Sequence, residues 1–215
     1  MNRAKFVIIL LLLYSAVCPA QVQKKYTLEI FEKGISGELE KLFYYPDVNR
    51  NFQFVFVVTG SDNKGALDSK FITSIIRKTA EKDNIRFSFT DSPDKLSKDS
   101  VFYIIKITDI NLVTKYPRFI KNRFLGDKTL ERNIAANIAV NMKSSDNTFS
   151  HKDNIVFNYH DEIDYDTYDS YESVEFGFTK AKPPKVSAFE SVLFPVLLVT
   201  VSAAATILFF TIRSK

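Results

Sequence analysis

The chain has 215 residues, of which 29 are Lys or Arg and 25 are Asp or Glu; this length accommodates one domain with a sizeable core. Four of the basic residues (Arg3, Lys5, Arg213 and Lys215) lie at the two ends, so the chain between them is formally neutral and no nucleic-acid partner is expected. The single cysteine, Cys18, excludes disulfides, cysteine-ligated metals and thiol nucleophiles from the rest of the chain.

The first segment, 1–20, has the pattern of a secretory signal peptide. It has a basic start, a short apolar run and small residues before Gln21. Lipidation of Cys18 is the alternative, but the residues before that cysteine match the lipoprotein pattern poorly. We therefore expect export of the rest of the chain, whether or not the signal is cleaved. The absence of Asn-X-Ser/Thr sequons and of disulfides favours a bacterial envelope over a eukaryotic secretory route.

The exported domain is expected to cover 21–180 and to begin with short elements. Residues 26–31 (YTLEIF) alternate as in a strand, and 36–45 have the composition of a short helix. The run 52–60 (FQFVFVVTG) is rich in aromatic and β-branched residues and is apolar on both faces, which predicts a central buried strand.

A helix is predicted over 67–82, followed by a strand over 85–89. Within the helix, apolar residues recur every three to five positions and form one stripe: Leu67, Phe71, Ile72, Ile75, Ile76 and Ala80. The strand–helix–strand order places this helix on one face of a sheet.

Three further segments are predicted as strands: 101–113, 131–144 and 154–159. In the second, apolar residues alternate with asparagines and alanines, as in a strand with one buried face. Turn residues between the second and third segments predict an antiparallel hairpin. The predicted fold class is α+β, with a single mixed or antiparallel sheet of five to six strands, helices on one face, and one C-terminal transmembrane helix.

The acidic segment 161–178 contains no Lys or Arg, and its tyrosines recur every three residues. We expect an acidic-faced helix that packs Tyr165, Tyr168 and Tyr171 on the sheet. A stiff, proline-containing linker, 181–191, follows.

The last hydrophobic segment, 192–212, carries no charged residue, and as a helix it has a length of about 31 Å. It is predicted to span a membrane. The signal peptide then places the domain in the periplasm and the tail 213–215 in the cytoplasm, as expected for a single-pass protein of the bacterial inner membrane.

One segment is the preferred candidate for partner or lipid contact, because basic and aromatic residues together suit anionic headgroups or an acidic protein surface. An ordinary solvated loop is the competing interpretation. The candidate residues are Lys115, Tyr116, Arg118, Phe119, Lys121, Arg123, Phe124 and Lys128.

No catalytic, metal-binding or cofactor-binding residue is expected. The loop Gly60–Gly65 lacks the Lys-Ser/Thr of a phosphate loop, and the acidic segment lacks a calcium-loop spacing. His151 and His160 flank a predicted strand at an odd spacing, which directs them to opposite faces.

The order of elements resembles the domain shared by the curli-secretion protein CsgG, the flagellar protein FlgO and the N-terminal domain of TolB. The resemblance covers about 50–178 and depends on the strand–helix–strand order, a long strand ending at Thr108-Asp109, and the hairpin NIAVNMKSSDNTFSHKDNIVF. It implies a component of envelope assembly or transport and supplies no catalytic residues.

The sequence as a whole predicts a membrane-anchored, extracytoplasmic binding or scaffolding component of a bacterial envelope system, with an envelope protein as partner. Two alternatives are an envelope hydrolase that uses Asp and Glu, and a domain that binds a lipid or small ligand. The hydrolase predicts two convergent carboxylates about 5 to 10 Å apart, and the ligand-binding domain predicts an apolar cavity under the sheet.

Overall fold

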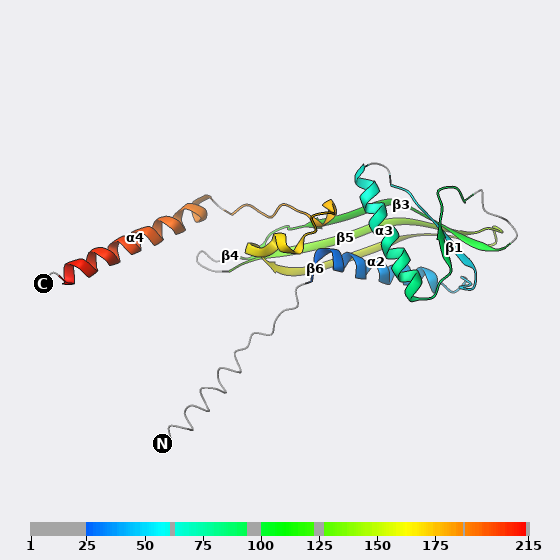
Figure 1. Cartoon of the computed structure of the whole chain (residues 1–215), viewed down its shortest axis with the longest axis horizontal. Coiled ribbons are helices and arrows are strands. Elements are labelled where there is room, and N and C mark those ends of the chain that lie inside the picture. The colour runs from blue at the N-terminus through cyan, green and yellow to red at the C-terminus, as the bar shows by residue number, and fades with distance from the viewer. Residues whose placement is uncertain (1–24, 61–62, 94–99, 123–126, 187, 214–215) are drawn as a thin grey trace, which may run out of the picture.

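The computed structural model describes residues 25–60, 63–93, 100–122, 127–186 and 188–213 (Figure 1). The predicted signal peptide, 1–20, lies outside these residues, as do Arg123, Phe124 and part of the Gly60–Gly65 loop.

A six-stranded mixed sheet forms the centre of the fold. Its strands are β1 (Gln53–Val58), β2 (Phe87–Phe89), β3 (Phe102–Lys115), β4 (Phe119–Asn122), β5 (Lys128–Ser144) and β6 (Ser150–Asp164). The path runs β2-β1-β3-β5-β4, and β6 pairs with β5. Strand β1 is parallel to β2 and β3, whereas β5 is antiparallel to β3, β4 and β6. The predicted α+β class with a mixed sheet is confirmed.

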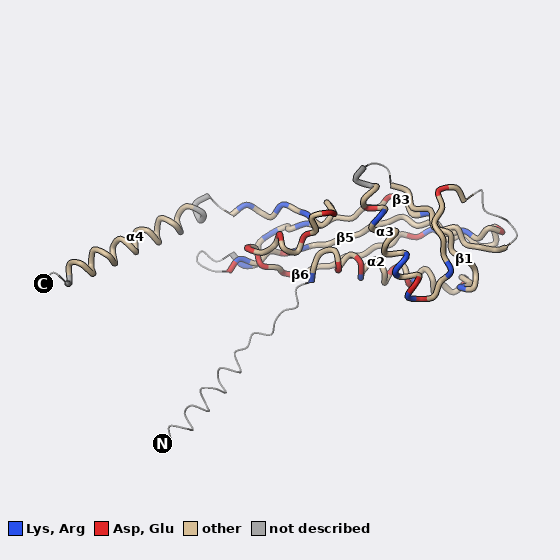
Figure 2. Tube along the Cα trace, in the orientation of Figure 1, with Lys and Arg blue, Asp and Glu red and all other residues tan. Residues whose placement is uncertain are grey.

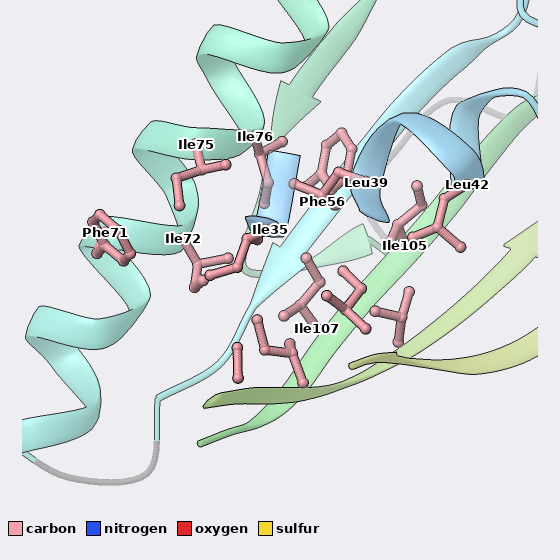
Figure 3. Close-up of a cluster of buried hydrophobic side chains, with 14 of the residues drawn as sticks. Ile35, Leu39, Leu42, Phe56, Phe71, Ile72, Ile75, Ile76, Ile105 and Ile107 are labelled. Atoms are coloured by element: carbon pink, nitrogen blue, oxygen red, sulfur yellow. The ribbon is translucent and has the colours of Figure 1, made fainter. Parts of the chain in front are cut away.

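Two helices, α2 (Thr27–Phe43) and α3 (Asn63–Lys82), cover one face of this sheet (Figure 1). The core lies between the layers because the apolar stripes of the helices meet the apolar face of the strands (Figure 3). Its most completely buried side chains include Phe31, Ile35, Leu39, Phe54, Phe56, Ile72, Ile75, Ile76, Ile105 and Ile107. Burial of each contributes about 1.5–3 kcal/mol to the hydrophobic stabilisation of the fold.

The predicted first strand over 26–31 is wrong, because these residues form the first turns of α2. The helix buries Phe31, Ile35, Leu39 and Leu42 on one face, at the spacing of three to four that a helix requires. Gly34 lies inside this helix and allows a close approach to β6. A Cβ atom at this position would lie 2.4 Å from the ring of Phe157 on β6.

The acidic segment 161–178 does not form the predicted helix. Its first residues complete β6, and two short 3₁₀ helices follow, η2 (Tyr165–Tyr171) and η3 (Gly177–Thr179). A 3₁₀ helix has 3.0 residues per turn, so tyrosines three residues apart lie on one side. Tyr165, Tyr168 and Tyr171 pack against a second small core of Tyr116, Leu130 and Ile163. The expected packing of the tyrosines is thus present on a different helix type.

The predicted transmembrane helix over 192–212 is contradicted. These residues belong to α4 (Ala188–Arg213), and within the described part of the chain no helix is long and apolar enough to cross a membrane. The predicted linker 181–191 is also shorter than expected, because α4 begins at Ala188.

Candidate functional site

Two aromatic residues of the predicted contact segment, Tyr116 and Phe119, pack in the second small core. Tyr116 is only 4 % exposed, and its ring packs on that of Tyr168 at a centroid distance of 5.6 Å. Phe119 is partly buried and packs on Tyr165 at 5.3 Å. These two aromatic side chains therefore stabilise the end of the sheet rather than forming a contact surface.

Tyr116 also connects the strand end to the segment that precedes α4. Its hydroxyl donates a hydrogen bond to Glu172 Oε1 at 3.1 Å, and the same oxygen accepts the backbone N–H of Ala181 at 3.1 Å. Burial, followed by the charge of Glu172, raises the pKa of Tyr116 above its usual value of 10.0. The folded protein therefore favours the neutral phenol.

This raised pKa predicts a loss of stability in alkaline solution. The contribution of neutral Tyr116 is complete below about pH 10 and is lost as the pH rises toward the folded-state pKa. In the wild type, the free energy of unfolding should fall with pH by up to about 1.4 kcal/mol per pH unit more than in Tyr116→Phe. Urea unfolding at several pH values above 10 measures the difference. Parallel curves for the two proteins would contradict the prediction.

The described basic residues of the same segment differ in exposure and in ion pairing. Arg118 is 73 % exposed, and its Nε lies 2.6 Å from Glu131 Oε2, which lowers the pKa of Glu131. Lys128 is half-buried, whereas Lys115 and Lys121 are exposed. The structure thus leaves Lys115 and Lys121 as the exposed cations of this segment that no described ion pair neutralises.

A different surface has the geometry of a binding site, namely the open edge of β6. In the described part of the chain, β6 pairs only with β5, and its other edge carries no strand. Natural edge strands are usually guarded by charged residues or proline. The middle of β6, 154–160 (NIVFNYH), has neither. It is therefore available for pairing with another extended segment.

A groove lies between β6 and α2, on the helix side of the sheet. Its volume is about 590 Å³, and it is lined by Lys25, Glu29, Ile30, Lys33, Gly34, Glu38, Phe157 and Tyr159. The absence of a side chain at Gly34 lets the helix backbone approach the Phe157 ring. The Nζ of Lys25 lies 5.7 Å from the centroid of the Tyr159 ring. Side chains of a strand added to β6 would enter this groove on every second residue.

A buried ion pair fixes one end of the groove. Arg132, which is 0 % exposed, donates from Nε and Nη2 to the two carboxylate oxygens of Asp161, at 2.8 and 2.6 Å. Its remaining bonds reach Thr27 Oγ1 at 3.0 Å and the carbonyl of Lys25 at 3.1 Å. The guanidinium also lies over the ring of Tyr171, 5.2 Å from its centroid. Arg132 thereby ties the start of α2 to β5 and β6.

The burial of Arg132 could have been predicted from the alternation of β5. Arg132 has the same parity as Ile134, Ala136 and Ile138, so it lies on the buried face of β5. A charged residue on the apolar face of a strand needs a buried partner. Only the tertiary structure identifies Asp161 as that partner.

The two histidines, His151 and His160, lie on opposite faces of β6. His151 packs on Tyr45 on the helix side, and His160 Nδ1 lies 3.0 Å from Asn133 Oδ1 on the opposite face, as their odd spacing predicted. Among the described residues, no group of three or more His, Cys, Asp and Glu is arranged to hold a metal ion. The two groove carboxylates, Glu29 and Glu38, are nine residues apart on α2, about 13.5 Å along its axis. They are not the convergent pair expected of a hydrolase.

Comparisons with known proteins give only distant likenesses. No family model and no curated protein sequence matches the chain. A structure of a neuraminyllactose-binding hemagglutinin homolog from Helicobacter pylori shares 9 % identity at a TM-score of 0.31, covering 57 % of this chain and 78 % of that one. A minor lipoprotein from Acinetobacter baumannii shares 10 % identity at a TM-score of 0.25, covering 56 % and 70 %. At these TM-scores the likenesses assign no function.

Proposed function

We propose that this chain is a binding protein of the bacterial envelope that holds an extended segment of a partner protein along β6, in the groove beside α2. The export signal predicted over 1–20 supports the envelope location. The observation that carries the binding mode is the unpaired, uncharged middle of β6 beside the groove. Addition of a strand to an exposed sheet edge is a known mode of peptide recognition, in which main-chain bonds give affinity and pockets give specificity.

The main-chain groups of β6 indicate which residues would bind the segment. The N–H of Asn154 donates to the side chain of Asp153 at 2.8 Å, on the side away from β5. Because the N–H and C=O groups of successive strand residues point to opposite edges, those of Val156 and Asn158 share the open side. Asn158 lies at the middle of the uncharged stretch and is exposed.

The residues that line the groove indicate which side chains the bound segment should carry. Ile30, Phe157 and Tyr159 provide an apolar floor, while Lys25, Lys33, Glu29 and Glu38 provide charges of both signs at its rim. The segment should therefore carry apolar side chains at alternate positions, flanked by polar residues. No strong net charge is required of it.

Proline substitution at Asn158 tests this mode. Peptides would first be selected from a displayed random library against the full chain, and their affinities measured by titration calorimetry. Asn158→Pro removes one edge N–H without removing a β5–β6 bond, and should weaken binding at least about tenfold, since a lost hydrogen bond leaves a partner carbonyl unpaired. The matched control Asn158→Val keeps the N–H and should bind within about twofold of the wild type.

Hydrogen exchange provides the second readout. Bound peptide should slow exchange of the β6 amides that face the open edge. Equal losses of affinity in the proline and valine variants, or a binding peptide that leaves β6 exchange unchanged, would show that strand addition is not the binding mode.

A further inference from the structure

Helix α4 presents an apolar surface to solvent. Leu197, Leu198 and Val199 are 44 %, 57 % and 66 % exposed, and Ile207 and Leu208 are 66 % and 60 % exposed. In Figure 1 the helix lies apart from the sheet and its two covering helices. Exposed apolar surface of this kind marks a site of contact with a protein or a membrane.

A basic segment immediately precedes this helix. Lys180, Lys182 and Lys185 are exposed, and no acidic residue occurs between Phe176 and Phe189. Figure 2 shows the blue of these lysines along the chain that leads to α4. Pro183 and Pro184 favour an extended, stiff conformation here, which holds the ammonium groups near the start of the apolar helix.

The linker is held against the end of the sheet that carries two further exposed lysines, Lys115 and Lys121, for which the described residues show no ion pair. Ala181 packs on the second small core with Tyr116, and its N–H is bonded to Glu172. Lys115 directly precedes Tyr116, and Lys121 lies on β4. We call Lys115, Lys121, Lys180, Lys182 and Lys185 the basic collar. Carboxylates also occur near the collar, since Glu172 accepts the Ala181 N–H and Glu190 belongs to the first turn of α4, but the linker between Lys180 and Lys185 carries three lysines and no acidic residue.

We propose that the basic collar and α4 together bind the surface of a membrane that contains anionic phospholipid. Apolar side chains and nearby cations are the two attractions that combine in binding to such a surface. The apolar part is independent of lipid charge, whereas the lysines contribute only where headgroups are anionic. The chemistry of the collar thus selects phosphatidylglycerol-type headgroups over zwitterionic ones.

Vesicle flotation of the full-length protein tests the proposal. Binding would be compared between vesicles of phosphatidylcholine alone and vesicles with about one third phosphatidylglycerol. Each lysine near an anionic surface contributes about fivefold in affinity, so K180Q/K182Q/K185Q should lower the preference for anionic vesicles about a hundredfold. The matched control K106Q/K143Q/K152Q removes three exposed lysines from the other half of the sheet and should retain the preference.

A salt titration on the wild type gives an independent readout that needs no variant. Raising the ionic strength from about 0.05 to 0.5 M should remove most of the preference for anionic vesicles, because the Debye length falls with added salt. The proposal fails if wild-type protein binds both vesicle types equally at low salt. It also fails if the collar and control variants lose the preference equally, or if the collar binds an acidic protein and no vesicle.

Discussion

Arg132→Ala is expected to lower the free energy of unfolding by about 3–5 kcal/mol. The substitution removes a guanidinium that is 0 % exposed and leaves Asp161 without its charged partner. It also removes the bonds that hold Thr27 and the Lys25 carbonyl, so the start of α2 should loosen from the sheet. Urea unfolding followed by circular dichroism measures the change.

A second, exposed Arg–carboxylate pair, joined by one hydrogen bond instead of two, provides the control. Arg118 and Glu131 approach to 2.6 Å, but Arg118 is 73 % exposed, so Arg118→Ala should cost no more than about 1 kcal/mol. The double variant R132M/D161L should lose less stability than Arg132→Ala, because it leaves no buried charge unpaired. A loss in Arg132→Ala as small as that in Arg118→Ala would show that the buried pair does not stabilise the fold.

Phe178→Ala is expected to cost about 3–5 kcal/mol, the range for truncation of a buried phenylalanine. Phe178 is 3 % exposed, and its ring lies 5.1 Å from that of Phe31 on α2 and 5.0 Å from that of Phe71 on α3. The residue inserts the segment after η2 between the two helices. Its loss should therefore destabilise the domain and free the linker that carries three lysines of the basic collar.

Val174 serves as the control for this prediction, since it belongs to the same segment but is 92 % exposed. Val174→Ala should change the free energy of unfolding by no more than about 0.5 kcal/mol. Limited proteolysis of the linker should accelerate in Phe178→Ala and stay unchanged in Val174→Ala. Equal stability of the two variants would mean that Phe178 is not part of the cooperative core.

Helices and strands could be predicted where the apolar residues followed either the helical or the strand period over many residues. The apolar stripe of α3, the buried run of β1 and the alternation of β5 each extend over enough residues to exclude the other period. At the start of α2, the six residues 26–31 are too few to distinguish the period of a strand from that of a helix. Tertiary packing favours the helix, because only in the helix do Ile30, Phe31 and Ile35 share the face that is buried against the sheet.

The predicted contact segment shows why local composition does not define a surface. Tyr116 and Arg118 are two residues apart, yet one is buried against η2 and the other is exposed beside Glu131. Burial depends on which distant segment packs on the strand end, in this case the tyrosines of η2. The resemblance to the CsgG, FlgO and TolB domain stays a prediction, as does the envelope partner.

The sequence by itself determined the class of the fold, the position of most strands, the helix α3 and the neutral charge of the domain. These features depend on local periodicity and on composition, both of which can be read from the sequence. The tertiary structure decided that β6 has an open edge, that α2 borders a groove beside it, and that Arg132 meets Asp161. Each of these depends on sheet order or on contacts between residues far apart in the chain, because an edge or a buried pair exists only once the strands are arranged.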